Sequence, residues 1–209
     1  MPTPIYEDAF ASPRYEVITP GRIHLPSGTV VACDPFFCGI ATPFGRTVTP
    51  GSYDVQLCRA DSSGFGKRIA LARIVFQQQT SVVTSEKATQ AGTGSNQYLV
   101  ESGLGCFMDE STRRKFVEVM GRFYKETPDG NYYNDALASE FKKSAMYPDD
   151  PDDGGTWAVH ELPDSQLNVV MFATGLGDGA YESFWGLSPE GTIVSLTTDF
   201  RILSPGSPA

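Results

Sequence analysis

The chain has 209 residues, enough for one substantial domain, and its 40% hydrophobic and 20% charged content is typical of a folded soluble protein. Its 25 acidic residues outnumber the 16 basic ones and give a net charge of −9, which argues against binding of a nucleic-acid backbone and is compatible with a basic protein partner. No stretch approaches the roughly 18 apolar residues that span a bilayer, so we expect no membrane partner either.

The start of the chain shows neither the basic region nor the apolar run of a signal peptide, so we expect a cytoplasmic protein. The cysteines contain no C-x-x-C pair, and we expect all of them to be buried, reduced thiols: Cys33, Cys38, Cys58 and Cys106. We expect a single domain over residues 1–209, with its core at about 14–203 and a disordered tail at 204–209.

The first hundred residues alternate short apolar segments with glycine- and proline-rich turns, which predicts strands. Residues 22–25 and 29–33 flank the turn Pro26-Ser27-Gly28, so we expect them to form a hairpin. Further strands are predicted at residues 15–18, 52–59, 68–77 and 97–101. The polar stretch 85–96 is expected to be flexible.

The middle of the chain predicts two helices. Apolar residues at helical spacing indicate a first helix that reaches residue 126, with Asp109 or Ser111 as its N-cap. A second helix is predicted over residues 134–147, capped by Asn134 and ended by Pro148. The acidic run 148–155 is expected to be an exposed loop.

Strands resume in the last quarter of the chain. They are predicted at residues 156–161, 167–174, 181–187 and 192–200, and the turn Ser-Pro-Glu-Gly joins the last two. The fold class is therefore α+β, a mostly antiparallel sandwich or half-barrel that two middle helices cover in part. We expect strands of both halves to pair, with 167–174 and 192–200 central because they are the most apolar.

Three aspartates lie at strand ends or in glycine-rich turns: Asp34, Asp109 and Asp178. Convergent carboxylates bind Mg²⁺ or Ca²⁺ or act as general acids and bases, so one hypothesis is a metal-assisted hydrolase in which Tyr181 orients the substrate. The alternative is structural, because aspartates also start turns, cap helices and accept backbone hydrogen bonds. We favour the structural interpretation, and with it the absence of a cofactor.

The acidic loop offers a different kind of site. It carries four aspartates that we expect to contact a basic partner protein, such as a toxin: Asp149, Asp150, Asp152 and Asp153. His24 and His160 have no spacing typical of a zinc site, and each is interpreted as a hydrogen-bonded histidine of a sheet.

Four blocks of sequence resemble the bacterial family called domain of unknown function 4241. They are "LPSGTVVACDPF" (25–36), "TVTPGSYDVQL" (47–57), "LVESGLGCFMD" (99–109) and "NVVMFATGLGDGAYESFWGLSPEGTIVSLTTDF" (168–200). The G-D-G motif of the family is intact at Gly177-Asp178-Gly179. Its A-G-T-G motif aligns with Ser-Gly-Leu-Gly at 102–105, where serine and leucine replace alanine and threonine and Glu101 replaces an expected aspartate.

The resemblance implies a compact, mostly β domain of bacterial cytosolic type, and it transfers no catalytic residue. Small acidic domains of such families often accompany toxin or defence genes. We therefore expect a non-enzymatic protein-binding module, with an immunity protein that neutralises a toxin as its narrower form. The metal-assisted hydrolase is the alternative.

Overall fold

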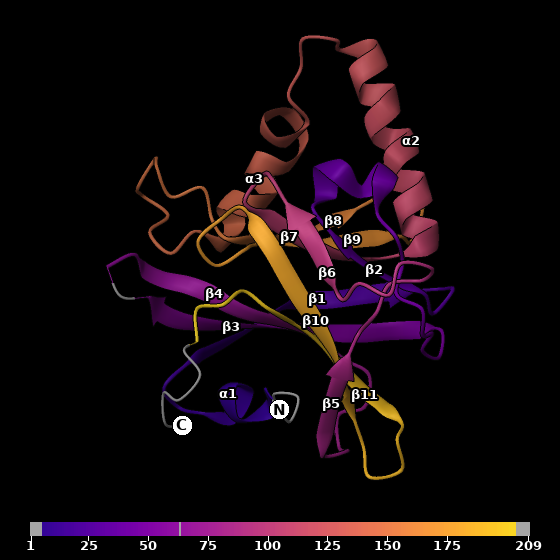
Figure 1. Cartoon of the computed structure of the whole chain (residues 1–209). Helices are drawn as coiled ribbons and strands as arrows, with labels where there is room; N and C mark the ends of the chain where they lie inside the picture. The colour runs from indigo at the N-terminus through magenta and orange to yellow at the C-terminus, as the bar shows by residue number, and fades with distance from the viewer. Residues whose placement is uncertain (1–5, 63, 204–209) are drawn as a thin grey trace.

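The computed structural model describes residues 6–62 and 64–203 and folds them into two antiparallel sheets with a helical layer (Figure 1). The predicted fold class, α+β with mostly antiparallel strands and helices in mid-chain, is confirmed. The expected tail at 204–209 lies outside the described residues.

The larger sheet has seven strands. Six follow the order β1-β3-β4-β11-β10-β5, and β6 pairs with β10 beside β5. Their bounds are β1 Glu16–Leu25, β3 Gly51–Ser62, β4 Gly66–Val75, β5 Thr84–Lys87, β6 Gln97–Val100, β10 Gly179–Leu187 and β11 Ile193–Asp199. Strands of both halves of the chain pair here, as predicted, and β11 lies in the interior of the sheet between β4 and β10.

The smaller sheet has four strands in the order β2-β7-β9-β8. Their bounds are β2 Val30–Cys33, β7 Leu104–Asp109, β8 Trp157–Glu161 and β9 Asn168–Ala173. Alternate side chains of its strands face two different cores: Val170 and Phe172 point toward the larger sheet, whereas Val169 and Met171 point toward the helices. Because both faces are covered, β9 reads as a continuous apolar run, "NVVMF".

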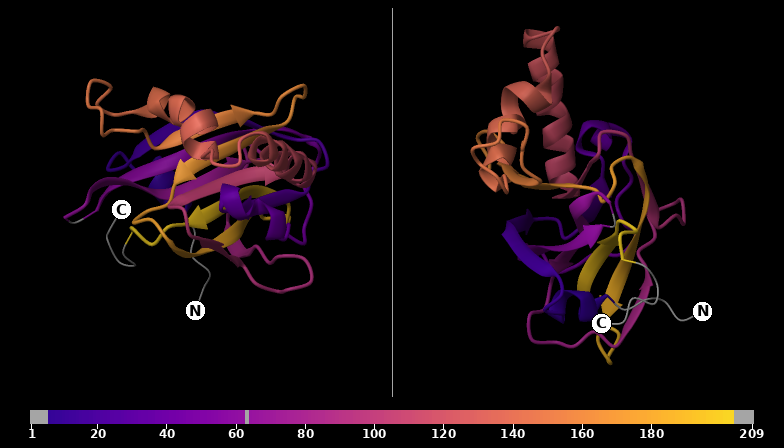
Figure 2. Two further views of the ribbon diagram at one scale, coloured as in Figure 1. Left: turned by 90° about the horizontal axis from the view of Figure 1, so that it is seen from above. Right: turned by 90° about the vertical axis from the view of Figure 1, so that its left-hand side faces the viewer.

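The helical layer covers the outer face of the smaller sheet (Figures 1 and 2). Helix α2 (Glu110–Glu126) begins at Asp109, whose carboxylate accepts a hydrogen bond from the Ser111 N–H, so the predicted cap is confirmed. The predicted second helix is broken into three short pieces: the π-helix η2 (Tyr133–Leu137), the α-helix α3 (Ala138–Phe141) and the 3₁₀ helix η3 (Lys142–Ser144). Asn134 therefore lies inside a π-helix and is not its N-cap.

The predicted hairpin of residues 22–25 and 29–33 is wrong. A turn does form between these segments, with the Gly28 N–H bonded to the Leu25 carbonyl, but β1 pairs with β3 and β2 pairs with β7 in the other sheet. The reason lies at Ser27, whose N–H and hydroxyl both donate to the Asp109 carboxylate at the end of β7. This contact directs the chain from one sheet to the other.

Three elements were not predicted from the sequence. The short helix α1 (Glu7–Ala11) packs Phe10 on the outer face of the larger sheet, and the 3₁₀ helix η1 (Pro35–Ile40) follows β2. Strand β5 starts at Thr84 and overlaps the stretch 85–96 that we expected to be flexible. In the part of the chain that the structure describes, no helix is long and apolar enough to cross a membrane.

A buried histidine attaches the broken helical segment to β8. The His160 Nδ1 lies 3.1 Å from a Glu140 carboxylate oxygen, and its Nε2 lies 3.1 Å from the Tyr132 hydroxyl. When Nδ1–H donates to Glu140, the neutral ring accepts the Tyr132 hydroxyl at Nε2. His160 is thus the hydrogen-bonded sheet histidine that its sequence context predicts.

We predict that Tyr132→Phe lowers the free energy of unfolding by about 1–2 kcal/mol, because it leaves the buried His160 Nε2 without its hydrogen-bond partner. Tyr133→Phe is the matched control, since its hydroxyl has no hydrogen bond within the described residues and we expect a change within about 0.5 kcal/mol. Urea unfolding of both variants measures the difference. Equal effects would contradict the role assigned to the Tyr132 hydroxyl.

Candidate functional site

Asp34 is fully buried, and it connects three segments of the chain. One carboxylate oxygen accepts the Phe36 N–H at 2.9 Å and so caps η1. The other oxygen accepts the N–H groups of Glu101 at 3.0 Å and Ser102 at 2.9 Å, in the loop that follows β6. Three N–H donors compensate the buried negative charge, as a carboxylate away from water requires.

The Ser-Gly-Leu-Gly segment continues from this contact. The Gly103 carbonyl accepts hydrogen bonds from the Thr174 N–H and hydroxyl, both at 3.0 Å. At Gly105 an added Cβ would lie 2.9 Å from atoms of Phe172 and of Thr174, so only glycine fits at this close approach of two strands. The Thr174 hydroxyl also donates to the Gly177 carbonyl at 2.8 Å, and this shared contact brings the segments 102–105 and 177–179 together.

The loop before β10 is closed by its own hydrogen bonds. The Gly177 N–H donates to the Thr174 carbonyl at 2.6 Å, and the Tyr181 hydroxyl donates to the Gly177 carbonyl at 2.6 Å. Gly175 has a φ of +47°, and an added Cβ would lie 2.7 Å from the Phe200 carbonyl oxygen. Burial raises the pKa of Tyr181, which suits a hydrogen-bond donor that stays protonated. Tyr181 thus holds the loop in place.

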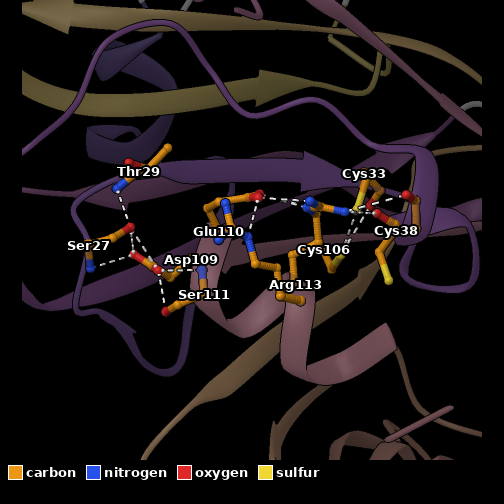
Figure 3. Close-up of polar contacts among 11 residues, drawn as sticks. Ser27, Thr29, Cys33, Cys38, Cys106, Asp109, Glu110, Ser111 and Arg113 are labelled. Atoms are coloured by element: carbon orange, nitrogen blue, oxygen red, sulfur yellow. Dashed lines mark hydrogen bonds and ion pairs between the residues drawn. The ribbon is translucent and has the colours of Figure 1, made fainter. Parts of the chain in front are cut away.

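Asp109 has a similar role at the other end of β7. Its carboxylate accepts from the N–H and hydroxyl groups of both Ser27 and Ser111, at 2.6–3.0 Å (Figure 3). The next residue, Glu110, pairs with Arg113, and the Arg113 guanidinium donates to the Cys38 carbonyl at 3.2 Å. This chain of contacts holds η1 against the N-terminal part of α2.

The structure does not bring the candidate carboxylates together. Asp109 lies opposite Val30, so Asp34 is displaced along β2 by about 13 Å at roughly 3.3 Å per residue. Asp178 is exposed, and its carboxylate makes no hydrogen bond within the described residues. Among residues 6–62 and 64–203, no group of three or more His, Cys, Asp or Glu side chains is placed to hold a metal ion.

All four cysteines are buried and free, as predicted. The Sγ atoms of Cys33 and Cys106 lie 3.7 Å apart across β2 and β7 (Figure 3). Burial raises the pKa of the Cys38 thiol to about 12 and that of Cys58 to about 11. These two thiols are therefore protonated near neutral pH and are poor nucleophiles.

The acidic loop is organised by one of its own aspartates. The Asp153 carboxylate accepts from the N–H groups of Met146 and Tyr147, both at 2.7 Å, and of Gly155 at 3.0 Å, and these bonds lower its pKa. Its role is internal to the loop. The other three aspartates are exposed: Asp149, Asp150 and Asp152.

An open groove of about 610 Å³ lies between the β2–η1 corner and β6. Its rim carries apolar side chains that are unusually exposed: Ile40 at 85%, Leu99 at 67% and Phe37 at 49%. Among the described residues, the two charged ones that line the groove are acidic: Asp34, which is buried, and Glu101, which is exposed. Sequence reasoning missed this groove. A signal was present at Leu99, an apolar residue on the outward face of a predicted strand.

A model of one protein family matches residues 23–198, which is most of the chain. The chain belongs to the family described as Protein of unknown function (DUF4241). The match includes the glycine-rich segments 102–105 and 177–179, so the two packed loops lie in the family region. No curated protein and no solved structure matches the chain.

We predict that Asp34→Asn lowers the free energy of unfolding by about 2–4 kcal/mol, because an amide in place of the second oxygen leaves the Glu101 and Ser102 N–H groups without an acceptor. Asp178→Asn is the matched control and should change stability by less than about 0.5 kcal/mol. Urea unfolding compares the two. An unchanged stability in Asp34→Asn would show that this carboxylate does not hold the loop.

Proposed function

We propose that the chain is a cytoplasmic, non-enzymatic protein-binding module that contacts its partner through the groove between η1 and β6. The observation that carries this proposal is the exposed apolar rim formed by Phe37, Ile40 and Leu99. Contiguous exposed apolar side chains next to a hollow are typical of interaction sites on soluble proteins. Covering one such aliphatic side chain contributes about 2 kcal/mol.

Charge supports a basic partner. The net charge is −9, and the outward aspartates Asp149, Asp150 and Asp152 add a concentrated negative region away from the groove. Long-range attraction of this kind raises the association rate of an oppositely charged protein without direct contact. The acidic loop then guides the partner, whereas the groove holds it.

We propose more narrowly that the chain is an immunity protein and that its partner is a toxin. Its support is the acidic surface, together with the setting in which small domains of such families often occur. The hydrolase alternative has less support, because Asp34 and Asp109 use their carboxylates as acceptors for nearby N–H groups and lie far apart.

We predict that Ile40→Asp reduces capture of the partner by roughly 30-fold, the factor that corresponds to about 2 kcal/mol, when the tagged 209-residue chain is incubated with lysate of the native host. Leu176→Asp is the matched control, because Leu176 is 60% exposed and lies in the loop before β10. The bound protein is identified and quantified by mass spectrometry.

A protein retained by the wild type and by Leu176→Asp but lost by Ile40→Asp supports the groove as the binding site. Capture that Ile40→Asp leaves unchanged, or no captured protein, contradicts the proposal. The immunity role has its own test: the captured protein should arrest growth when expressed alone, and co-expression of the chain should restore growth. A harmless partner would refute that narrower role.

A further inference from the structure

Within the described residues, one edge of β6 pairs with no other strand, and the hydrogen-bond pattern shows which backbone groups point out of that edge. The Ser183 N–H of β10 donates to the Asn96 carbonyl at 2.8 Å, and Tyr98 lies opposite Tyr181. Backbone groups of successive residues in an antiparallel strand point alternately to the two sides. The N–H and C=O of Tyr98 therefore face β10, whereas those of Leu99 point away from it.

The backbone N–H and C=O groups that point out of the β6 edge differ in whether they have hydrogen-bond partners. Those of Gln97 both bond to the Ser95 hydroxyl, at 3.1 and 3.3 Å. Those of Leu99 have no hydrogen-bond partner within the described residues. This position is thus ready to pair with a strand from another chain.

The opposite wall of the groove shows the same feature. Glu110 donates its N–H to the Thr29 carbonyl, so by alternation Ala32 turns its backbone groups away from β7. Ala32 is buried, lines the groove, and its N–H and C=O also have no partner within the described residues. Buried backbone groups are nearly always paired, so the groove offers polar backbone atoms as well as an apolar rim.

The side chains and the charge of the groove restrict which ligand it can bind. Leu99 and Ile40 favour an apolar side chain of the ligand. Glu101 is the exposed charged residue of the lining, and no basic residue lines the groove within the described chain. A Lys or Arg of the ligand therefore complements this end of the groove.

We propose that the outer edge of β6 binds an extended segment of the partner protein as an added strand, with an apolar side chain against Leu99 and Ile40 and a Lys or Arg at Glu101. Binding by strand addition takes its affinity from main-chain hydrogen bonds and its specificity from alternate side chains. This inference rests on the proposed function and specifies the chemistry of the bound segment.

Random decapeptides displayed on phage, selected on the full chain, test it. We expect selected peptides that alternate apolar residues and contain a Lys or Arg. Leu99→Pro should weaken the best peptide at least 10-fold, because proline removes the outward N–H and leaves the bonds of Tyr98 to β10 in place. Leu99→Val keeps that N–H and should bind within 3-fold of wild type. Glu101→Gln should weaken binding several-fold and reduce its dependence on salt.

A peptide N-methylated at alternate amides provides the same test without changing the protein, in case Leu99→Pro fails to fold. Methylation at one set of amides should abolish binding, and methylation at the other set should leave it intact. Peptides that Ile40→Asp loses but Leu99→Pro and N-methylation leave unaffected would overturn strand addition, with the protein-binding function standing. Enrichment of no peptide, while a lysate partner is still captured through Ile40, would overturn the extended segment as well.

Discussion

The buried carboxylate of Asp34 is the contact on which the arrangement of the candidate site depends. It accepts three backbone N–H groups, from Phe36 in η1 and from Glu101 and Ser102 after β6. These segments belong to different parts of the sandwich, since β2 lies in the smaller sheet and β6 in the larger one. A buried charge needs its donors, so the three segments cannot separate without leaving the carboxylate uncompensated.

The two glycine motifs of the family follow from this arrangement. Once the loop after β6 is held by Asp34, Gly103 meets the Thr174 side chain, and Gly105 allows β7 and β9 to approach closely. The G-D-G loop is closed by the Tyr181 hydroxyl. Both motifs thus serve the architecture, and the groove is a consequence of it: the same contact places η1 beside β6 and leaves the Leu99 edge open.

Local signals in the sequence predicted the elements that depend on nearby residues. The β10–β11 hairpin, α2 with its Asp109 cap, and the doubly buried β9 were all readable from turn residues, cap chemistry and apolar runs. The order of the strands in the two sheets could not be predicted in this way. The turn at Pro26-Ser27-Gly28 was recognised, but its two flanks separate because Ser27 bonds to Asp109, 82 residues later. No local pattern reports such a contact.

The candidate site shows the same division. The sequence offered Asp34, Asp109 and Tyr181 as candidate site residues, but it could not show their buried hydrogen bonds, because those bonds depend on segments distant in sequence. The exposed rim of Ile40 and Leu99 escaped prediction because an edge is defined by which strands do not pair beside it.

Residue-resolved hydrogen exchange of the backbone amides, measured by NMR, tests the central claim most directly. The account predicts that the Leu99 amide exchanges at least about 100-fold faster than those of Tyr98 and Val100, which face β10, and than those of Glu101 and Ser102, which donate to Asp34. Equal protection of Leu99 and its neighbours, or rapid exchange of Glu101 and Ser102, would contradict it.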